Sequence, residues 1–213
     1  MTRKEVKENL KKQLEKNLHI TIDITEEDIK KVIDFSEEME KAKPGEAGYK
    51  TDNKNIAGRN ISGKIGELAL EKYLGVPFVD FSIGKSKDYN IPDLSPAGYW
   101  LGIKTARLSN GVAYVPSRPK YGEILCIYDE DNQKVYIMGL ATEKVITRYG
   151  QRDLIPPHVI WWKTGFGRYD KLSPITKDLL EQYKTDNVMS TWEPCFTVLF
   201  FIFKITVQYT LFI

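Results

Sequence analysis

The chain has few of the residues from which disulfide frameworks and zinc sites are built. It contains two cysteines, Cys126 and Cys195, and two histidines, His19 and His158, and each stands alone in the sequence. Without C-x-x-C pairs or paired cysteine and histidine spacings, zinc fingers and disulfide-stabilised folds are excluded. The segment Met1–Asn17 is charged throughout and does not resemble a secretory signal peptide. We therefore expect a cytoplasmic protein.

Long apolar runs are also scarce, except in residues 196–213. Phe, Ile, Leu, Val and Thr dominate that segment, but Lys204 and Gln208 interrupt it. A membrane-spanning helix usually needs about 20 mostly apolar residues, so a membrane anchor is disfavoured. The β-branched and aromatic content suits added strands, and the segment is equally compatible with a non-native extension.

Acidic residues are absent from one stretch of the chain. None occurs between Leu94 and Gly122, where four basic residues fall, and between Lys144 and Lys171 six basic residues face two acidic ones. The net charge of +2 says little, but positive charge concentrated in segments suits a polyanionic partner. Ordinary solvated surface charge is the alternative for either segment.

Apolar periodicity predicts a helical N-terminal arm. The apolar residues of Thr2–Leu18 form one narrow stripe, and Thr25 with Asp28 resembles a capping box that opens a second helix. We expect the arm to pack on the core or on a second subunit, so a homodimer is compatible with the sequence. The predicted units are the helical arm (1–44), a core domain (45–185) and the hydrophobic tail (186–213).

The core domain is predicted to be α/β, with a mixed central β-sheet flanked by helices. The expected helices span residues 61–74, 142–149 and 174–183. The expected strands span residues 76–81, 89–94, 99–108, 123–128 and 134–140. A tight turn at residues 95–98 would join the second and third strands into a hairpin.

Three polar residues stand out in this core: Glu67 on a helix, Asp93 at the end of a predicted strand, and Lys104 on the next strand. Two acids and a lysine from separate elements can hold a divalent metal and activate water. Because side chains alternate along a strand, Lys104 shares its face with Gly102. Ile103 then points into the core, with its carbonyl directed at the site.

The order of these motifs resembles the PD-(D/E)XK nuclease superfamily. Pro92-Asp93 matches the first half of its signature, and Gly102-Ile103-Lys104 matches the second half after a spacer of eight residues. The segment 63–67, which ends at Glu67, looks like the helical glutamate motif of that group. Residues 135–142 look like the strand and turn before its second core helix. The resemblance covers roughly residues 55–175 and implies a restriction-endonuclease-like core.

The resemblance also implies a chemistry. Mg²⁺ or Mn²⁺ would be bound by Asp93, by the Ile103 carbonyl and by Glu67, which would bind the metal or orient its water. Lys104 would position the attacking water and offset charge in the transition state. The catalytic residues would be Glu67, Asp93 and Lys104. The implied reaction is hydrolysis of DNA phosphodiesters by a restriction-type, phage-type or junction-resolving endonuclease, with no small-molecule cofactor.

Gly102 departs from this family pattern, which usually has an acidic residue there. Glycine removes one charged ligand and weakens the attraction of the site for a hard cation. Glu71, Asp88 or Glu123 could replace the missing acid, or the site could work with fewer ligands. Alternatively, the chain is an inactive variant that binds DNA without cleaving it.

Basic and aromatic residues supply candidate contacts to DNA phosphates and bases. The expected phosphate contacts are Arg59, Lys64, Arg107, Asn110, Arg118 and Lys120. Trp161, Trp162 and Phe166 offer stacking surfaces, although core packing is the simpler expectation for at least two of them. Glu67 alone is also typical of a surface glutamate paired with Lys64.

Overall fold

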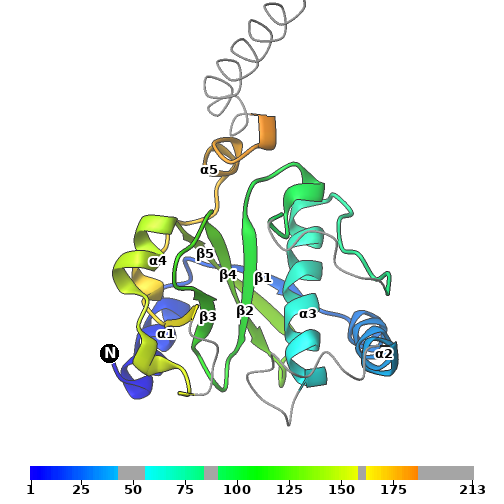
Figure 1. Ribbon diagram of the computed structural model, residues 1–213, viewed down its shortest axis with the longest axis horizontal. Helices are drawn as coiled ribbons and strands as arrows, with labels where there is room; N and C mark the ends of the chain where they lie inside the picture. The colour runs from blue at the N-terminus through cyan, green and yellow to red at the C-terminus, as the bar shows by residue number, and fades with distance from the viewer. Residues whose placement is uncertain (43–55, 84–90, 158–161, 187–213) are drawn as a thin grey trace, which may run out of the picture.

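The computed structural model describes residues 1–42, 56–83, 91–157 and 162–186, and a four-stranded mixed sheet lies at its centre (Figure 1). The sheet has the order β1-β5-β4-β2, while β3 and β6 form a separate two-stranded ribbon, the β3–β6 ribbon. The strands are β1 (Ile20–Asp23), β2 (Gly102–Arg107), β3 (Ala113–Pro116), β4 (Glu123–Asp129), β5 (Lys134–Ala141) and β6 (Lys163–Phe166).

Helices flank this sheet, so the predicted mixed α/β architecture is confirmed. They are α1 (Arg3–Glu15), α2 (Glu26–Ala42), α3 (Ile56–Leu74), α4 (Glu143–Tyr149) and α5 (Lys177–Glu181). Short 3-10 turns lie at η2 (Ser95–Ala97), η3 (Arg152–Leu154) and η4 (Tyr169–Lys171). The predicted capping box is present: the Thr25 amide donates to Asp28 at 2.9 Å and the Asp28 amide donates to the Thr25 hydroxyl at 3.2 Å. It satisfies amides that would otherwise lack partners at the start of α2.

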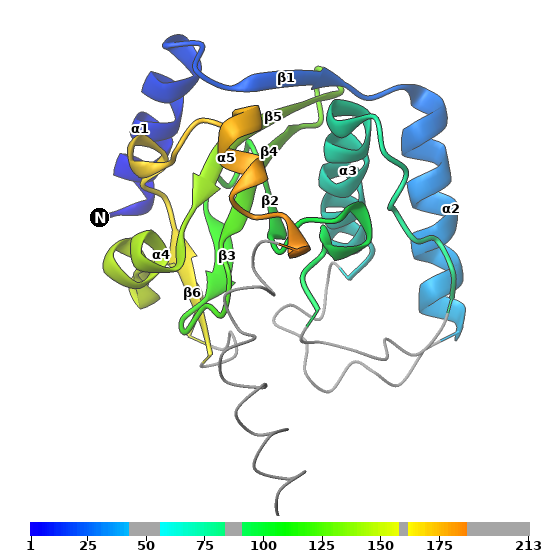
Figure 2. The ribbon, with the colours of Figure 1, turned by 90° about the horizontal axis from the view of Figure 1, so that it is seen from above.

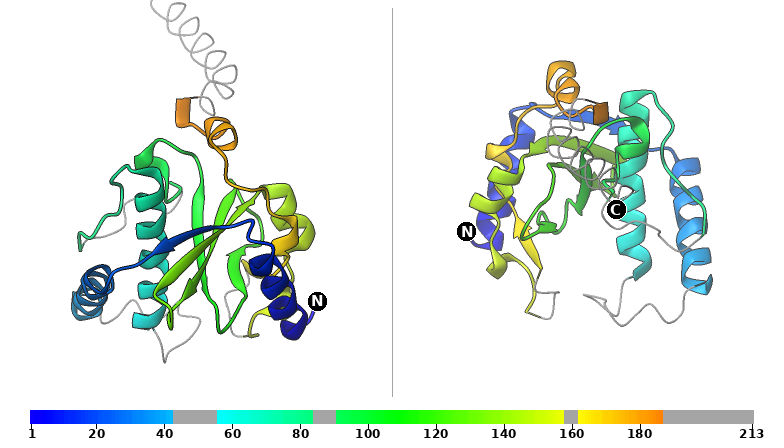
Figure 3. Two further views of the ribbon diagram at one scale, coloured as in Figure 1. Left: turned by 180° about the vertical axis from the view of Figure 1, so that it is seen from behind. Right: turned by 45° about the horizontal axis from the view of Figure 1, so that its top comes forward.

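Both faces of the sheet are buried, because alternate residues of β4 enter two different apolar clusters. Leu125 and Ile127 pack with residues of α1, α4 and the β3–β6 ribbon. Ile124 and Cys126 pack on the other face with residues of α2, α3 and α5. Figures 2 and 3 show the same arrangement, with α1 and α4 on one side of the sheet and α3 and α2 on the other.

The N-terminal segment packs on the core, which is one of the two placements expected for it. Val6 and Leu10 of α1 are buried in the first cluster. The segment after α1, predicted only as an extended link, is a strand of the main sheet: β1 pairs antiparallel with β5, from Ile20↔Ile137 to Asp23↔Lys134.

Two predicted strands are wrong over the residues that the structure describes. Residues 76–81 form no strand because the amides of Phe78 and Val79 donate to the Glu71 carboxylate at 2.7 and 2.8 Å instead of to another strand. Residues 91–94 form a turn that leads into η2, and residues 89–90 lie outside the described part. The hairpin expected to carry Asp93 and Lys104 is therefore absent there.

The neighbour of β2 in the sheet is instead β4, which runs parallel to it from Gly102↔Glu123 to Arg107↔Tyr128. The strands β3 and β6 lie in segments where no strand was predicted, whereas the other strands and helices of the core match the prediction closely. β4 and β5 flank a turn, Thr142 caps α4, and α5 falls within the expected range. In the described part of the chain, no helix has the length and apolar character needed to cross a membrane. Most of the hydrophobic tail lies outside the described residues.

Candidate active site

Asp93 reaches the start of β2 from the turn before η2. Its Oδ2 atom accepts hydrogen bonds from the Ile103 amide at 2.8 Å and from the Lys104 ammonium at 3.2 Å. The side chain keeps 40% of its surface exposed. The predicted proximity of Asp93 and Lys104 is therefore present, although a turn rather than a hairpin produces it.

The Lys104 ammonium lies among three oxygen atoms. It donates to the Ile103 carbonyl at 2.8 Å and to Asp93, and it forms an ion pair with Glu123 Oε2 at 3.2 Å. As expected from strand alternation, Ile103 itself is buried in the cluster beneath α3. The carboxylates of Asp93 and Glu123 and the carbonyl of Ile103 thus surround one position, which the Lys104 ammonium occupies.

Gly102 leaves the space that the Glu123 carboxylate occupies. The two residues are direct partners in the parallel pair of β2 and β4. A Cβ atom on residue 102 would lie 2.1 Å from Glu123 Oε2 and 2.9 Å from the Tyr121 ring. An acid from the neighbouring strand therefore takes the place that a side chain at position 102 would have.

Glu123 is the least accessible charged group of the site. Its side chain is 1% exposed, and neither carboxylate oxygen accepts a well-oriented hydrogen bond from the described residues. Burial raises the pKa of Glu123 to about 7, with Lys104 opposing the rise and Asp93 adding to it. For Lys104, burial lowers the pKa, but the charges of Glu123 and Asp93 outweigh it and the pKa is raised. Lys104 is consequently protonated at neutral pH.

Glu67 lies near this group without bonding to it. It forms an ion pair with Lys64 at 2.5 Å, as the i, i+3 spacing on α3 predicts. Burial raises the pKa of Glu67 and the charge of Lys64 opposes the rise. Smaller effects come from Asp93, which raises this pKa, and from Lys104, which lowers it. Figure 1 shows how this arises, since α3 runs alongside the edge strand β2.

Among the described residues, no group of three His, Cys, Asp or Glu side chains is arranged to hold a metal ion. The predicted ligands Asp93, Ile103 and Glu67 are thus not gathered as a complete side-chain set. Of the three acids that could replace the missing ligand, Glu123 is the one that lies beside Gly102. Glu71 is bound to the amides of Phe78 and Val79, and Asp88 lies outside the described residues.

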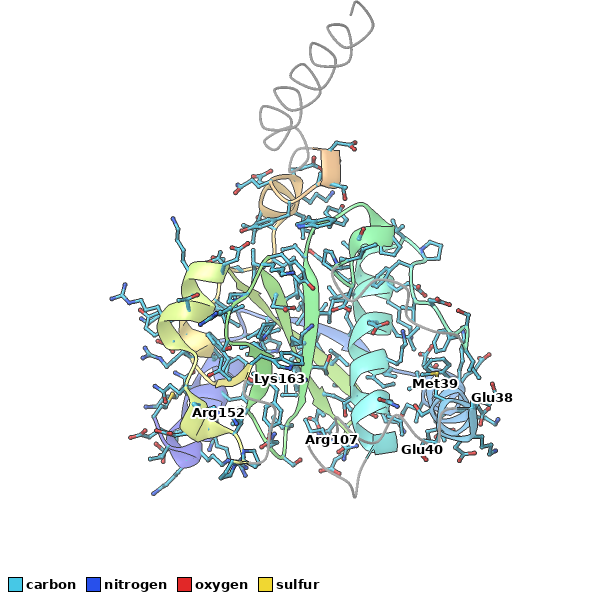
Figure 4. All side chains as sticks on the ribbon, in the orientation of Figure 1. Glu38, Met39, Glu40, Arg107, Arg152 and Lys163 are labelled. Atoms are coloured by element: carbon cyan, nitrogen blue, oxygen red, sulfur yellow. The ribbon has the colours of Figure 1, made fainter. Side chains whose placement is uncertain are left out.

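Three of the residues predicted to contact DNA bind other groups of the protein. Lys64 is paired with Glu67. Arg107 donates to the Ser62 hydroxyl at 3.0 Å and pairs with Glu130 at 3.4 Å, and Figure 4 labels it between β2 and α3. The Asn110 side chain donates to the Val112 carbonyl at 3.4 Å.

Other predicted DNA contacts remain accessible to a ligand. Arg118 and Lys120 are exposed on the loop that leads into β4 and Glu123, whereas the side chain of Arg59 lies outside the described part. Phe166 is fully buried, which confirms core packing for that ring, but Trp162 is 43% exposed. Trp161 lies outside the described residues.

Comparison of the chain with protein-family models, with curated proteins and with solved structures finds no match.

Proposed function

We propose that this protein is a metal-dependent DNA endonuclease with a restriction-endonuclease-like core, in which Glu123 supplies the acid that Gly102 lacks. One observation carries the proposal: the Glu123 carboxylate fills the side-chain space of residue 102 and lies 3.2 Å from the Lys104 ammonium. With Glu123 of β4 beside Gly102, an acid occupies the place where the PD-(D/E)XK signature has one on β2.

The donor set suits a hard divalent cation. The carboxylates of Asp93 and Glu123 and the carbonyl of Ile103 all face the Lys104 ammonium, and Mg²⁺ and Mn²⁺ prefer such oxygen ligands. A bound metal would supply Lewis-acid chemistry and a lowered pKa for its water. Lys104 would have to move aside, which a flexible four-carbon side chain permits.

The other polar groups of the site would have separate roles in hydrolysis. Lys104 is protonated, so its role is to stabilise negative charge on the phosphate rather than to take a proton from water. Glu67 has a raised pKa and lies on α3, which packs along β2, so its role would be to orient water and accept its proton. Exposed Arg118 and Lys120 would contact the DNA backbone beside Glu123.

The direct test is cleavage of supercoiled plasmid DNA by the full chain with Mg²⁺ or Mn²⁺. We expect nicking or linearisation that disappears with EDTA and in Asp93→Asn, because the amide loses the charge that faces the metal. Asp131→Asn, on the exposed β4–β5 turn, is the matched control and should cleave like the wild type. Equal cleavage by Asp93→Asn and the wild type would refute the assignment.

A second function is favoured by the ion pairs of Lys104. Because its ammonium already compensates Asp93 and Glu123, a chain that never binds metal would also be stable, as a nuclease-fold protein that holds DNA without cutting it. Binding of plasmid DNA with no cleavage in either metal, and no Mn²⁺ binding by calorimetry, would establish that alternative.

A further inference from the structure

The β3–β6 ribbon lies beside β2, the strand that carries Lys104 of the candidate active site. It lies on the opposite side of β2 from α3, as Figures 2 and 3 both show. Its register, Ala113↔Phe166 to Pro116↔Lys163, places the start of β6 next to the end of β3. The adjoining loop then runs from Ser117 to Glu123, so this end of the ribbon is connected directly to the buried acid of the site.

An aromatic ring is held at that end of the ribbon. Trp162 is 43% exposed, and its carbonyl accepts hydrogen bonds from the Ser117 amide at 2.8 Å and the Ser117 hydroxyl at 3.0 Å. By contrast, Phe166 at the other end of β6 is fully buried. The backbone of Trp162 is therefore fixed while its side chain is partly exposed, which leaves an aromatic surface available to a ligand.

Positive charge lies beside this ring and on the adjoining loop that begins at Ser117. The Lys163 ammonium lies 5.1 Å from the centre of the Trp162 ring. Arg118 and Lys120 are exposed on the same loop, and no acid occurs in the sequence from Leu94 to Gly122. An aromatic face with several cations is suited to a nucleic-acid strand, with stacking on the base and ionic contacts to the phosphates.

Only a short stretch of chain links this end of the ribbon to the candidate active site, so one DNA strand could contact both. Figure 4 labels Lys163 on the ribbon, on the side of β2 away from α3, and its charge slightly lowers the pKa of the Glu123 carboxyl. Ser117 and Glu123 are six positions apart along the chain, a span of at most about 20 Å. That span corresponds to roughly six nucleotides at the duplex spacing of about 3.4 Å along one strand.

We propose, on the basis of the function proposed above, that the ribbon tip (Ser117, Arg118, Lys120, Trp162 and Lys163) binds an unpaired nucleotide of the DNA substrate. Trp162 stacks on the base while the basic residues contact the flanking phosphates. In a continuous duplex the base faces are covered by their neighbours, so only an unpaired base offers a face to Trp162. The preferred substrate therefore carries a single-stranded, gapped or frayed segment.

Binding in EDTA tests this inference separately from cleavage. Fluorescence anisotropy would compare a labelled single strand, a blunt duplex and a gapped duplex of equal length. We expect the wild type to bind the single strand and the gapped duplex more tightly than the blunt duplex. Trp162→Ala should weaken binding to these two DNAs by roughly 5- to 100-fold, the range for loss of one stacked base, and should leave binding to the blunt duplex nearly unchanged.

Two further variants make the result interpretable. Trp162→Phe should retain most of the affinity because it keeps an aromatic face. Leu18→Ala, at a 65% exposed apolar residue far along the chain, should bind as the wild type does. Equal weakening of all three DNAs by Trp162→Ala, or a wild-type preference for the blunt duplex, would overturn the inference. A failed cleavage assay leaves these binding results readable, and a lost single-strand preference leaves cleavage of plasmid DNA intact.

Discussion

The two ends of β2 each place a cation beside acids, but in very different surroundings. At the first end, Lys104 pairs with Asp93 and with Glu123, whose side chain is 1% exposed. At the other end, Arg107 pairs at 3.4 Å with Glu130, whose side chain is 42% exposed. The distances are similar, so burial rather than geometry distinguishes the two ends.

That difference separates a functional arrangement from an ordinary surface contact. An exposed ion pair typically contributes about 0–1 kcal/mol to stability. A buried carboxylate loses several kcal/mol of hydration that a single ion pair does not restore, and the pKa of Glu123, raised to about 7, reflects that loss. Acids kept in such positions cluster at binding and catalytic sites, so the Lys104 end is the one where we expect activity.

The largest expected effect is on cleavage in Glu123→Gln. The change keeps the volume of the side chain but removes its charge, so metal-dependent cleavage should fall by about 100-fold or more. Glu130→Gln makes the same chemical change at the other end of β2 and should leave cleavage within about two-fold. The measurements are plasmid cleavage rates and Mn²⁺ affinity by calorimetry. Comparable losses in both variants would remove the distinction between the two ends.

The next effect concerns the space above Gly102. In Gly102→Ala the new Cβ would collide with the Glu123 carboxylate, 2.1 Å away, so we expect a loss of about 1–3 kcal/mol in the free energy of unfolding. The double variant Gly102→Glu with Glu123→Ala moves the acid back to β2 and should recover part of the cleavage that Glu123→Ala loses. Urea denaturation and plasmid cleavage measure the two effects. An unchanged stability of Gly102→Ala would mean that Glu123 does not fill this space.

The sequence predicts those parts of the fold that local patterns determine. The buried face of α3 follows from its apolar spacing, and β4 and β5 follow from apolar runs around a polar turn. The strand expected at 76–81 fails because Glu71 accepts hydrogen bonds from the Phe78 and Val79 amides. Apolar residues there resemble a strand, and hydropathy does not show that a side chain has taken the backbone donors.

Sequence patterns predict only part of the candidate site. Asp93 and Lys104 were predicted to be close, and they are bonded. Glu123 could only be considered as one acid among three, because its place over Gly102 depends on the parallel pairing of β2 with β4. That pairing joins residues 21 positions apart, and no turn or repeating pattern specifies its register.

A smaller effect is the pH dependence of stability. Because burial raises the pKa of Glu123 from its usual 4.5 to about 7 in the folded state, this group stabilises the fold most at pH below its unfolded pKa. The contribution is lost as the pH rises through about 7. Relative to Glu123→Gln, the wild type should lose about 1–2 kcal/mol of unfolding free energy between pH 4 and pH 8. Urea denaturation of both proteins across this range provides the difference, and parallel pH profiles would contradict the raised pKa.

The smallest effect is expected at the Arg107 end. A double-mutant cycle with Arg107→Gln and Glu130→Gln should give a coupling energy of about 0.2–1 kcal/mol, since the side chains are 30% and 42% exposed and water screens the pair. The coupling should fall further in about 1 M salt, where the screening length is about 3 Å. Single variants at Arg107 also lose the hydrogen bond to Ser62, and the cycle removes that contribution because it is common to both arms. Urea denaturation at low and high salt supplies the free energies. A coupling that exceeds this range and persists in salt would show that the Arg107 end, too, is more than a surface ion pair.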